Sequence, residues 1–242
     1  MYFGYDDTIR WCKAVRDIGH THPAVTHGST ELFVIPSYPA LARTRDLFAG
    51  TRVGLGAQNL HWEDAGAYTG EVSGTMLAAT GCGYVEVGHA ERREMFGETD
   101  AVVAAKTAAA LRNGLVPVVC IGEPEPSPAA ESLLYCVEQL GSALSRSEAM
   151  GSTRVIVAYE PIWAIGAAEP APVEYIRAMC AGLRTAAIGW PSLAVTIIYG
   201  GAAGPGLLGM LQDCADGLFL GRSAHDPKAL EVVLDEALAL RP

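Results

Sequence analysis

The sequence predicts an α/β protein in which parallel strands alternate with helices and close into a barrel. Short runs rich in β-branched and apolar residues recur along the chain, and most are followed by a stretch with apolar residues at helical spacing. Strand followed by helix, repeated, gives a parallel sheet with right-handed crossovers. Half of the 242 residues are hydrophobic, which suits one large core of the size that α/β barrels have. We therefore expect residues 1–242 to form one barrel domain.

The chain is expected to open on a helix. Residues 6–19 begin with acidic side chains and then place Trp11, Val15 and Ile18 at helical spacing. Seven strands are predicted after it, at residues 32–35, 53–56, 84–87, 116–121, 155–159, 195–199 and 217–220. Further helices are predicted at residues 101–113, 129–145, 172–187 and 227–240. Residues 58–74 form one long loop, and such loops in compact domains are often functional.

Composition narrows the classes of partner. A net charge of −10 with only 17 basic residues argues against binding nucleic acid or an anionic membrane surface. No apolar run approaches the roughly 20 residues that span a bilayer, and the polar, acidic start is unlike a signal peptide, so a cytoplasmic protein is expected. The cysteines form no Cys-x-x-Cys pair and have no histidines at metal spacing, so we expect reduced core thiols and no metal. They are Cys12, Cys82, Cys120, Cys136, Cys180 and Cys214.

Glu160 is the first candidate for a catalytic group. It follows the predicted strand at 155–159, and in a parallel α/β barrel the loops at the carboxyl ends of the strands build the active site. Pro161 restricts Glu160 to extended geometry, and residues 162–165 are too apolar for an ordinary turn. A surface glutamate on a tight turn is the alternative. The apolar segment instead favours a carboxylate that faces a cleft under a hydrophobic lid.

His89 and Cys120 are further candidates at neighbouring strand ends. His89 precedes a helix expected to begin near Ala90, and the positive end of a helix disfavours a charge on the imidazole. A neutral imidazole can donate a hydrogen bond to a carbonyl oxygen and polarise it. A packing or capping role is the alternative for His89, and a solvated helix face is the alternative for the charged residues at 91–98.

Glycine-rich turns end the last two predicted strands and predict a phosphate site. Bare backbone amides at such turns can receive a phosphate, and Gly166 in the lid can join them. The candidate phosphate-binding residues are Gly166, Gly200, Gly201, Ala202, Gly221 and Arg222. A strand-end base, a neutral imidazole and a phosphate site under a lid suit aldose–ketose isomerisation, in which a proton next to a carbonyl moves to the adjacent carbon. Closing the lid would exclude water and protect the enediol intermediate.

Three segments resemble the signature segments of the triosephosphate isomerase family. They are VEVGHAERREMFGE at 85–98, AYEPIWAIG at 158–166 and IYGG at 198–201. The resemblance extends from about residue 31 to the C-terminus. It implies a (β/α)8-type barrel of which only seven strand–helix units are visible, with Glu160 as the base, His89 as the electrophile, and Glu91 and Cys120 as supporting groups. It implies no cofactor and no metal, and a small phosphorylated sugar as substrate.

The long loop is similar to the dimer-forming loop of the same family. Gln58, Asn59 and the segment GAYTGEVS at 66–73, which includes Thr69, carry this similarity. In the family this loop usually inserts into the partner beside its active site. The resemblance therefore implies a homodimer.

The chain start departs from the family pattern. Family members begin with a strand ending in Asn-x-Lys or a close variant, whose lysine holds the substrate's charge, whereas residues 1–4 resemble the segment just after that lysine. The first strand is therefore expected to be missing, leaving a gap between the strands at 32–35 and 217–220 with unpaired edges that favour association. The lysines all fall in helical patterns, so none is expected to inherit the role. They are Lys13, Lys106 and Lys228.

Smaller departures bear on the substrate. Ala202 stands where the family usually has serine, residues 167–169 (Ala-Ala-Glu) replace the usual lid hinge, and Arg222 replaces the second glycine of a Gly-Gly pair. Arg222 can contact the phosphate, fill part of the pocket or point to solvent. Residues 62–64 (Trp-Glu-Asp) and 221–223 (Gly-Arg-Ser) resemble the branch that isomerises four-carbon ketose phosphates.

The first hypothesis is therefore a triosephosphate isomerase acting in glycolysis and gluconeogenesis, slowed by loss of the lysine. The alternatives are a tetrulose-phosphate isomerase or a catalytically silent phosphate-binding homologue. A further explanation for the missing strand is that translation begins upstream of Met1.

Overall fold

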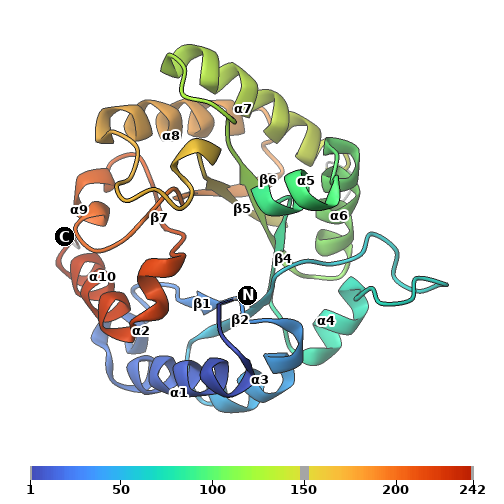
Figure 1. Ribbon diagram of the computed structural model, residues 1–242, viewed down its shortest axis with the longest axis vertical. Helices are drawn as coiled ribbons and strands as arrows, with labels where there is room; N and C mark the ends of the chain where they lie inside the picture. Colours follow the sequence, from blue (N-terminus) through green and yellow to red (C-terminus); the bar gives the residue numbers. More distant parts are fainter. Residues whose placement is uncertain (1, 148–152, 241–242) are drawn as a thin grey trace.

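Seven parallel strands curl into an incomplete ring with helices packed around its outside (Figure 1). This computed structural model describes residues 2–147 and 153–240. The strands follow one another around the sheet in chain order. They are β1 (Phe33–Val34), β2 (Gly54–Ala57), β3 (Tyr84–Val87), β4 (Val116–Ile121), β5 (Thr153–Tyr159), β6 (Leu193–Tyr199) and β7 (Gly217–Leu218). The predicted α/β class and all seven predicted strands are confirmed, although β1 and β7 are shorter than predicted.

The long helices match the predicted ones to within two residues at each end. These are α1 (Tyr5–Thr21), α6 (Asp100–Arg112), α7 (Ala129–Leu144), α8 (Val173–Ala187) and α10 (Pro227–Ala239). The sequence analysis did not predict α2 (Pro23–Thr26), α3 (Leu41–Phe48), α4 (Gly74–Thr80) and α9 (Leu207–Leu211), which are too short for a clear apolar period. A helix near Ala90 was expected and is α5 (Ala90–Phe96). No helix in the described ranges is both long and apolar enough to cross a bilayer.

The sheet is buried on both faces, as parallel sheets usually are. Residues facing outward pack under the helices in the main core, for example Val85 and Val87 of β3. Inward-facing residues fill the barrel interior, which contains Val118, Ile156 and Ile198. Because the two faces alternate along each strand, every second residue of β3–β6 points into the interior.

A polar network closes the interior at the amino ends of the strands. Tyr84 of β3 stacks on Phe33 of β1 with 4.3 Å between the ring centres, and its hydroxyl donates to Glu31. Arg154 of β5 donates to Oε1 of Glu31 at 2.7 Å, and this contact is the main reason why the pKa of Glu31 is lowered. The network connects β1 to the far side of the barrel.

The predicted gap lies between β1 and β7. In the described part of the chain, β1 pairs only with β2 and β7 pairs only with β6. Outside the gap, Val15 and Ile18 of α1 join Leu230 and Leu234 of α10 in one apolar cluster. The indole Nε1 of Trp11 donates to the carbonyl of Ala224 at 2.8 Å. Helix packing thus holds the two edges of the open sheet in place.

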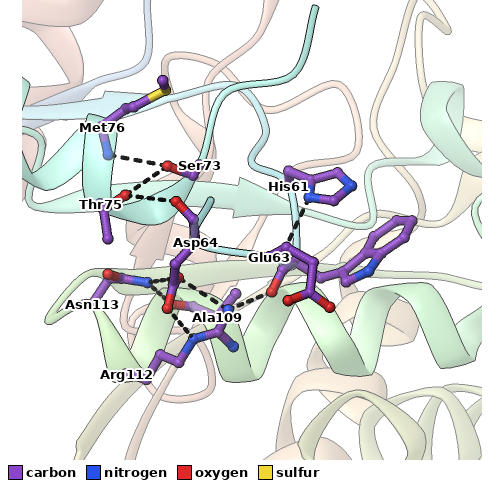
Figure 2. Close-up of polar contacts among 10 residues, drawn as sticks. His61, Glu63, Asp64, Ser73, Thr75, Met76, Ala109, Arg112 and Asn113 are labelled. Atoms are coloured by element: carbon purple, nitrogen blue, oxygen red, sulfur yellow. Dashed lines mark hydrogen bonds and ion pairs between the residues drawn. The ribbon is translucent and has the colours of Figure 1, made fainter. Parts of the chain in front are cut away.

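The long loop between β2 and α4 is anchored at its base by polar contacts (Figure 2). Residues 62–71 are all exposed. Asp64 accepts hydrogen bonds from Arg112 and Asn113 at the end of α6, and both contacts lower its pKa. The hydroxyl of Thr75 donates to the Asp64 carbonyl at 3.1 Å. A projecting, ordered loop results.

A buried lysine secures the beginning of the same loop. The ammonium of Lys106 on α6 donates to Oδ1 of Asn59 at 2.7 Å and to Oε1 of Glu98 at 2.5 Å, and all three residues are buried. Arg92 donates to the same carboxylate. A buried charge is tolerated only when it is paired in this way.

Candidate active site

Glu160 lies at the carboxyl end of β5, where neighbouring strands close tightly around it. Its backbone N–H donates to the carbonyl of Ile121 at 2.8 Å, and the residue is only 7% exposed. A Cβ on Gly122 would lie 1.9 Å from the Glu160 carbonyl oxygen, and one on Gly200 would lie 2.5 Å from its carboxylate Oε1. Glycine is therefore required at both positions. Gly200, predicted as a phosphate contact, lies against the candidate base.

The surroundings of Glu160 favour its protonated form. Burial raises its pKa, because leaving water disfavours the charged carboxylate. His89 and the Cys120 thiol partly offset this effect, whereas Glu91 adds to it. Its Oε2 is buried and has no hydrogen-bond partner among the described residues. A carboxylate with a raised pKa and a free oxygen is suited to accept a proton from carbon.

The His89 ring is fixed by the start of α5. The backbone N–H of Glu91 donates to its Nδ1 at 3.2 Å, so Nδ1 is unprotonated and we infer that Nε2 carries the ring proton. Nε2 lies 3.8 Å from Oε2 of Glu160, which is too long for a hydrogen bond. His89 therefore caps α5, the role named as its alternative, and this contact leaves a neutral Nε2–H on the side of Glu160, as the predicted electrophile role requires.

Two other predicted groups, Glu91 and Cys120, differ in their relation to the site. The Glu91 side chain is mostly exposed, 3.9 Å from Nδ1 of His89, so its firm contact with the histidine is through the backbone. Cys120 is buried, and burial together with Glu160 and Glu86 raises its pKa well above the ordinary value. Its thiol therefore stays protonated and can donate to a carboxylate.

The segment Ile162–Ala171, which contains the predicted lid at 162–166 and its predicted hinge at 167–169, is anchored at both ends. The carboxylate of buried Glu123 accepts from the indole Nε1 of Trp163 and from the Tyr175 hydroxyl, each at 2.8 Å. At the other end the backbone N–H of Ala171 donates to the Tyr199 hydroxyl at 3.2 Å. Between these anchors, residues 166–169 are exposed. The lid therefore has firm hinges and a free tip.

The candidate phosphate-binding residues come together from three loops. Gly166 adopts a φ of +76°, and a guanidinium nitrogen of Arg222 lies 3.1 Å from where its Cβ would be. Gly201 packs against the Tyr199 hydroxyl and Pro161, leaving no room for a side chain.

The loops after β6 and β7 carry two further candidates. Ala202 has a φ of +53°, a strained conformation often found at functional sites. Gly221 precedes the short 3₁₀ helix η4 (Arg222–His225). Arg222 is exposed and forms no ion pair with any residue in the described ranges.

The remaining predicted residues lie away from this cleft. Asn59 is buried beside Lys106, Gln58 donates to the carbonyl of Ile35 at 3.3 Å, and Thr69 is exposed at the tip of the long loop. The lysines of α1 and α10 are exposed on the outer helices, so among residues 2–147 and 153–240 no lysine stands at a strand end, as predicted. In these ranges no group of three or more His, Cys, Asp or Glu side chains is placed to hold a metal ion.

Three residues around the site were not predicted from the sequence. Glu123 and Tyr199 both hold the lid, and each follows or ends a predicted strand. Glu86 lies inside a predicted strand and not at its end. Glu86 points into the barrel and is flanked along β3 by apolar residues. A charged residue in the middle of an apolar strand is visible in the sequence and could have identified it.

Known proteins resemble the chain along nearly its whole length. The family model described as triosephosphate isomerase matches residues 1–237. An L-erythrulose-1-phosphate isomerase of Pectobacterium atrosepticum is 51% identical over 245 residues, which cover 99% of this chain and 93% of that protein. An L-erythrulose-1-phosphate isomerase of Rhizobium rhizogenes is 39% identical, over 98% of this chain and 90% of that protein. One of Brucella abortus is 43% identical, over 79% of this chain and 77% of that protein.

Replacing Glu160 by Gln should stabilise the protein at neutral pH. Burial raises the pKa of Glu160 in the folded protein above the ordinary glutamate pKa of about 4.3, which applies to the unfolded chain. Between these two pKa values the folded protein holds a proton that the unfolded chain has lost. The free energy of unfolding therefore falls as the pH rises from the lower pKa to the higher one. We expect Glu160→Gln to raise the free energy of unfolding by about 0.5–2 kcal/mol at pH 8, and the gain to shrink towards pH 5, in urea unfolding curves.

Exposed Glu94 on the neighbouring helix supplies the control. Glu94→Gln should change the free energy of unfolding by less than about 0.5 kcal/mol at both pH values. A gain from Glu160→Gln that is equal at pH 8 and pH 5 would contradict the assignment of the raised pKa to Glu160.

Proposed function

Because the chain belongs to the triosephosphate isomerase family, we propose that it is a sugar-phosphate isomerase whose substrate is a four-carbon ketose phosphate. The observation that carries this proposal is the pairing of buried Glu160 with the neutral Nε2–H of His89 across a cleft. The relatives that are 39–51% identical are isomerases of L-erythrulose 1-phosphate, which favours the tetrulose phosphate over the triose phosphate. The expectation of a role in glycolysis and gluconeogenesis has no support from them.

The proposed reaction moves one proton between neighbouring carbons. In L-erythrulose 1-phosphate the carbonyl is on C2, between the phosphate-bearing C1 and the hydroxyl-bearing C3. Glu160 takes the proton from C3, and the C–H electrons form the enediolate while the Nε2–H of His89 donates to the oxygen on C2. His89 gives that proton to the C2 oxygen and receives one from the C3 hydroxyl. Glu160 then returns its proton to C2, which leaves the carbonyl on C3.

The lid protects this intermediate. An enediolate next to a phosphate-bearing carbon can expel the phosphate, and water in the cleft would compete for the proton. Closing of Ile162–Ala171 over the substrate brings the Gly166 backbone towards the loops that contain Gly201 and Gly221. The anchors at Glu123 and Tyr199 leave the tip free to move while its ends stay fixed.

Triose-phosphate isomerisation is the second candidate, because the same base and donor act on a carbonyl and its neighbouring carbon in either sugar. The signature segments at 85–98 and 158–166 contain the base and the hydrogen-bond donor, which serve both reactions. They therefore do not distinguish a three-carbon from a four-carbon substrate. A silent homologue is the third possibility, motivated by the missing lysine.

The decisive experiment compares L-erythrulose 1-phosphate with dihydroxyacetone phosphate as substrates. In D2O, nuclear magnetic resonance should show that the C3 proton of the tetrulose phosphate is replaced by deuterium, and kcat/KM should be higher for this sugar. Glu160→Gln should lower kcat by about 10²–10⁴-fold because the base is lost, whereas Glu94→Gln should not change it. Faster turnover of the triose phosphate would select the second candidate, and no turnover of either sugar would select the silent homologue.

We propose in addition that Arg222 binds the substrate phosphate beside Gly166. It is a guanidinium without an ion-pair partner in the described ranges, at the point where the lid meets the loop after β7. Arginine suits phosphate because its planar fork can donate two parallel hydrogen bonds. In this role it supplies positive charge to a cleft that has no lysine among the residues that the structure describes.

Arg222→Met should therefore weaken phosphate binding. Loss of a charge-assisted hydrogen bond of about 1.5–3 kcal/mol predicts a rise of roughly 10–100-fold in KM and in the inhibition constant of inorganic phosphate. Arg43→Met, which changes an exposed arginine on α3, should leave both values unchanged. Identical constants in wild type and Arg222→Met would mean that Arg222 points to solvent.

We also propose a homodimer joined through the long loop. Tyr68 near its tip is 42% exposed, and Met95 and Phe96 on α5 are 70% and 65% exposed. A second copy can cover these apolar side chains, of which Met95 and Phe96 lie on the helix that His89 caps.

A charge at the loop tip should separate the subunits. Thr69→Arg is expected to lower the sedimentation coefficient from that of a dimer to that of a monomer, because a charge would be buried in the interface. Ala42→Arg, an equal change on exposed α3, should leave the dimer intact. A wild-type chain that sediments as a monomer at micromolar concentration would refute the proposal.

A further inference from the structure

Glu86 is a carboxyl group inside the barrel that the proposed mechanism does not use. It lies on β3, three residues before His89, and pairs in register with Val118 of β4. Val118 belongs to the apolar interior cluster, and since paired residues face the same side, Glu86 points into the interior as well. The residue remains partly accessible there. An ionisable side chain at such a position costs folding energy unless it is paired or hydrogen-bonded, so its presence there suggests a function.

The groups around Glu86 favour its neutral form. Sγ of Cys120 lies 4.0 Å from its Oε1, and this thiol is the one hydrogen-bonding contact of its side chain in the described part of the chain. Burial raises its pKa well above the ordinary value, the nearby carboxylates of Glu160 and Glu91 raise it further, and Arg92 opposes them only in part. A protonated carboxyl can donate one hydrogen bond and accept another, as a sugar hydroxyl also can.

The layout of the cleft directs one end of the substrate towards Glu86. The candidate phosphate contacts, Gly166, Gly201 and Arg222, lie on the loops after β5, β6 and β7. His89, which follows β3, and Cys120 of β4 lie on the other side of Glu160. A substrate with its phosphate at the first group therefore extends its unphosphorylated end towards β3 and β4. At that end a tetrulose phosphate carries a hydroxymethyl group on the reacting carbon, where a triose phosphate has only hydrogen.

We propose that Glu86 binds the terminal hydroxyl of the four-carbon substrate and sets the preference for this chain length. The proposal rests on the proposed function, since it assigns the substrate end of the same cleft. A site built to hydrogen-bond a hydroxyl discriminates strongly against an analogue that lacks it, because the site's own polar group is then left without a partner. An apolar pocket distinguishes one extra carbon far less well.

The first test uses two substitutions at Glu86. Glu86→Gln retains a neutral group that donates and accepts, so we expect kcat/KM for L-erythrulose 1-phosphate to stay within about 5-fold of wild type. Glu86→Leu removes both functions, and we expect this kcat/KM to fall by roughly 10²-fold while the value for dihydroxyacetone phosphate changes by less than about 3-fold. An equal change for both sugars in Glu86→Leu, or no change for either, would overturn the proposal.

The second test measures binding without turnover, by isothermal titration with erythritol 4-phosphate and glycerol 3-phosphate. These polyol phosphates differ in chain length and have no carbonyl to isomerise. Wild type and Glu86→Gln should bind the four-carbon probe at least about 10-fold more tightly than the three-carbon probe, and Glu86→Leu should bind the two equally. Equal binding of both probes by wild type would reject the role of Glu86.

The two tests separate failure of this inference from failure of the proposed function. A protein that turns over neither sugar, yet loses its preference for erythritol 4-phosphate in Glu86→Leu, would refute the isomerase and support Glu86 as the chain-length contact. A protein that isomerises the tetrulose phosphate with an unchanged sugar preference in Glu86→Leu would support the isomerase and refute the role of Glu86.

Discussion

The burial of the Glu160 carboxylate at the end of β5 is the constraint on which the rest of the site depends. Gly122 and Gly200 are glycines because a side chain at either position would occupy the space of Glu160 itself. The protonated Cys120 thiol and the neutral Nε2–H of His89 can lie beside this carboxylate without adding charge to a poorly solvated cleft. Close packing thus gives Glu160 its raised pKa, and the raised pKa suits it to proton transfer.

The lid depends on the same strand ends. Glu123 lies just beyond β4 and Tyr199 ends β6, so the two anchors of the lid belong to the strands on either side of β5. Any shift of these strands would move the hinges and the Glu160 pocket together. Because both anchors lie on neighbours of β5, the ends of the exposed segment at residues 166–169 keep a set position relative to Glu160.

The gap in the sheet is separated from the candidate catalytic residues. Cys120 lies on β4, and His89 and Glu160 follow β3 and β5, so at least one strand stands between each of them and β1 or β7. The edges at the gap are held by the apolar packing of α1 on α10, and the interior is held by the Glu31–Arg154 ion pair. The gap lies next to the loop after β7, which contains Arg222.

The sequence alone determined the α/β class, the seven strands, the long helices and the placing of Glu160, His89 and the lid, because each leaves a local pattern of apolar spacing, proline or glycine. The sequence alone did not predict short helices such as α3, because their formation depends on packing. Only the tertiary structure decided that Gly200 packs on Glu160 and that Lys106 pairs with Asn59 and Glu98. These contacts join residues far apart in the chain, and their partners are set by strand register and barrel curvature, which no local pattern specifies.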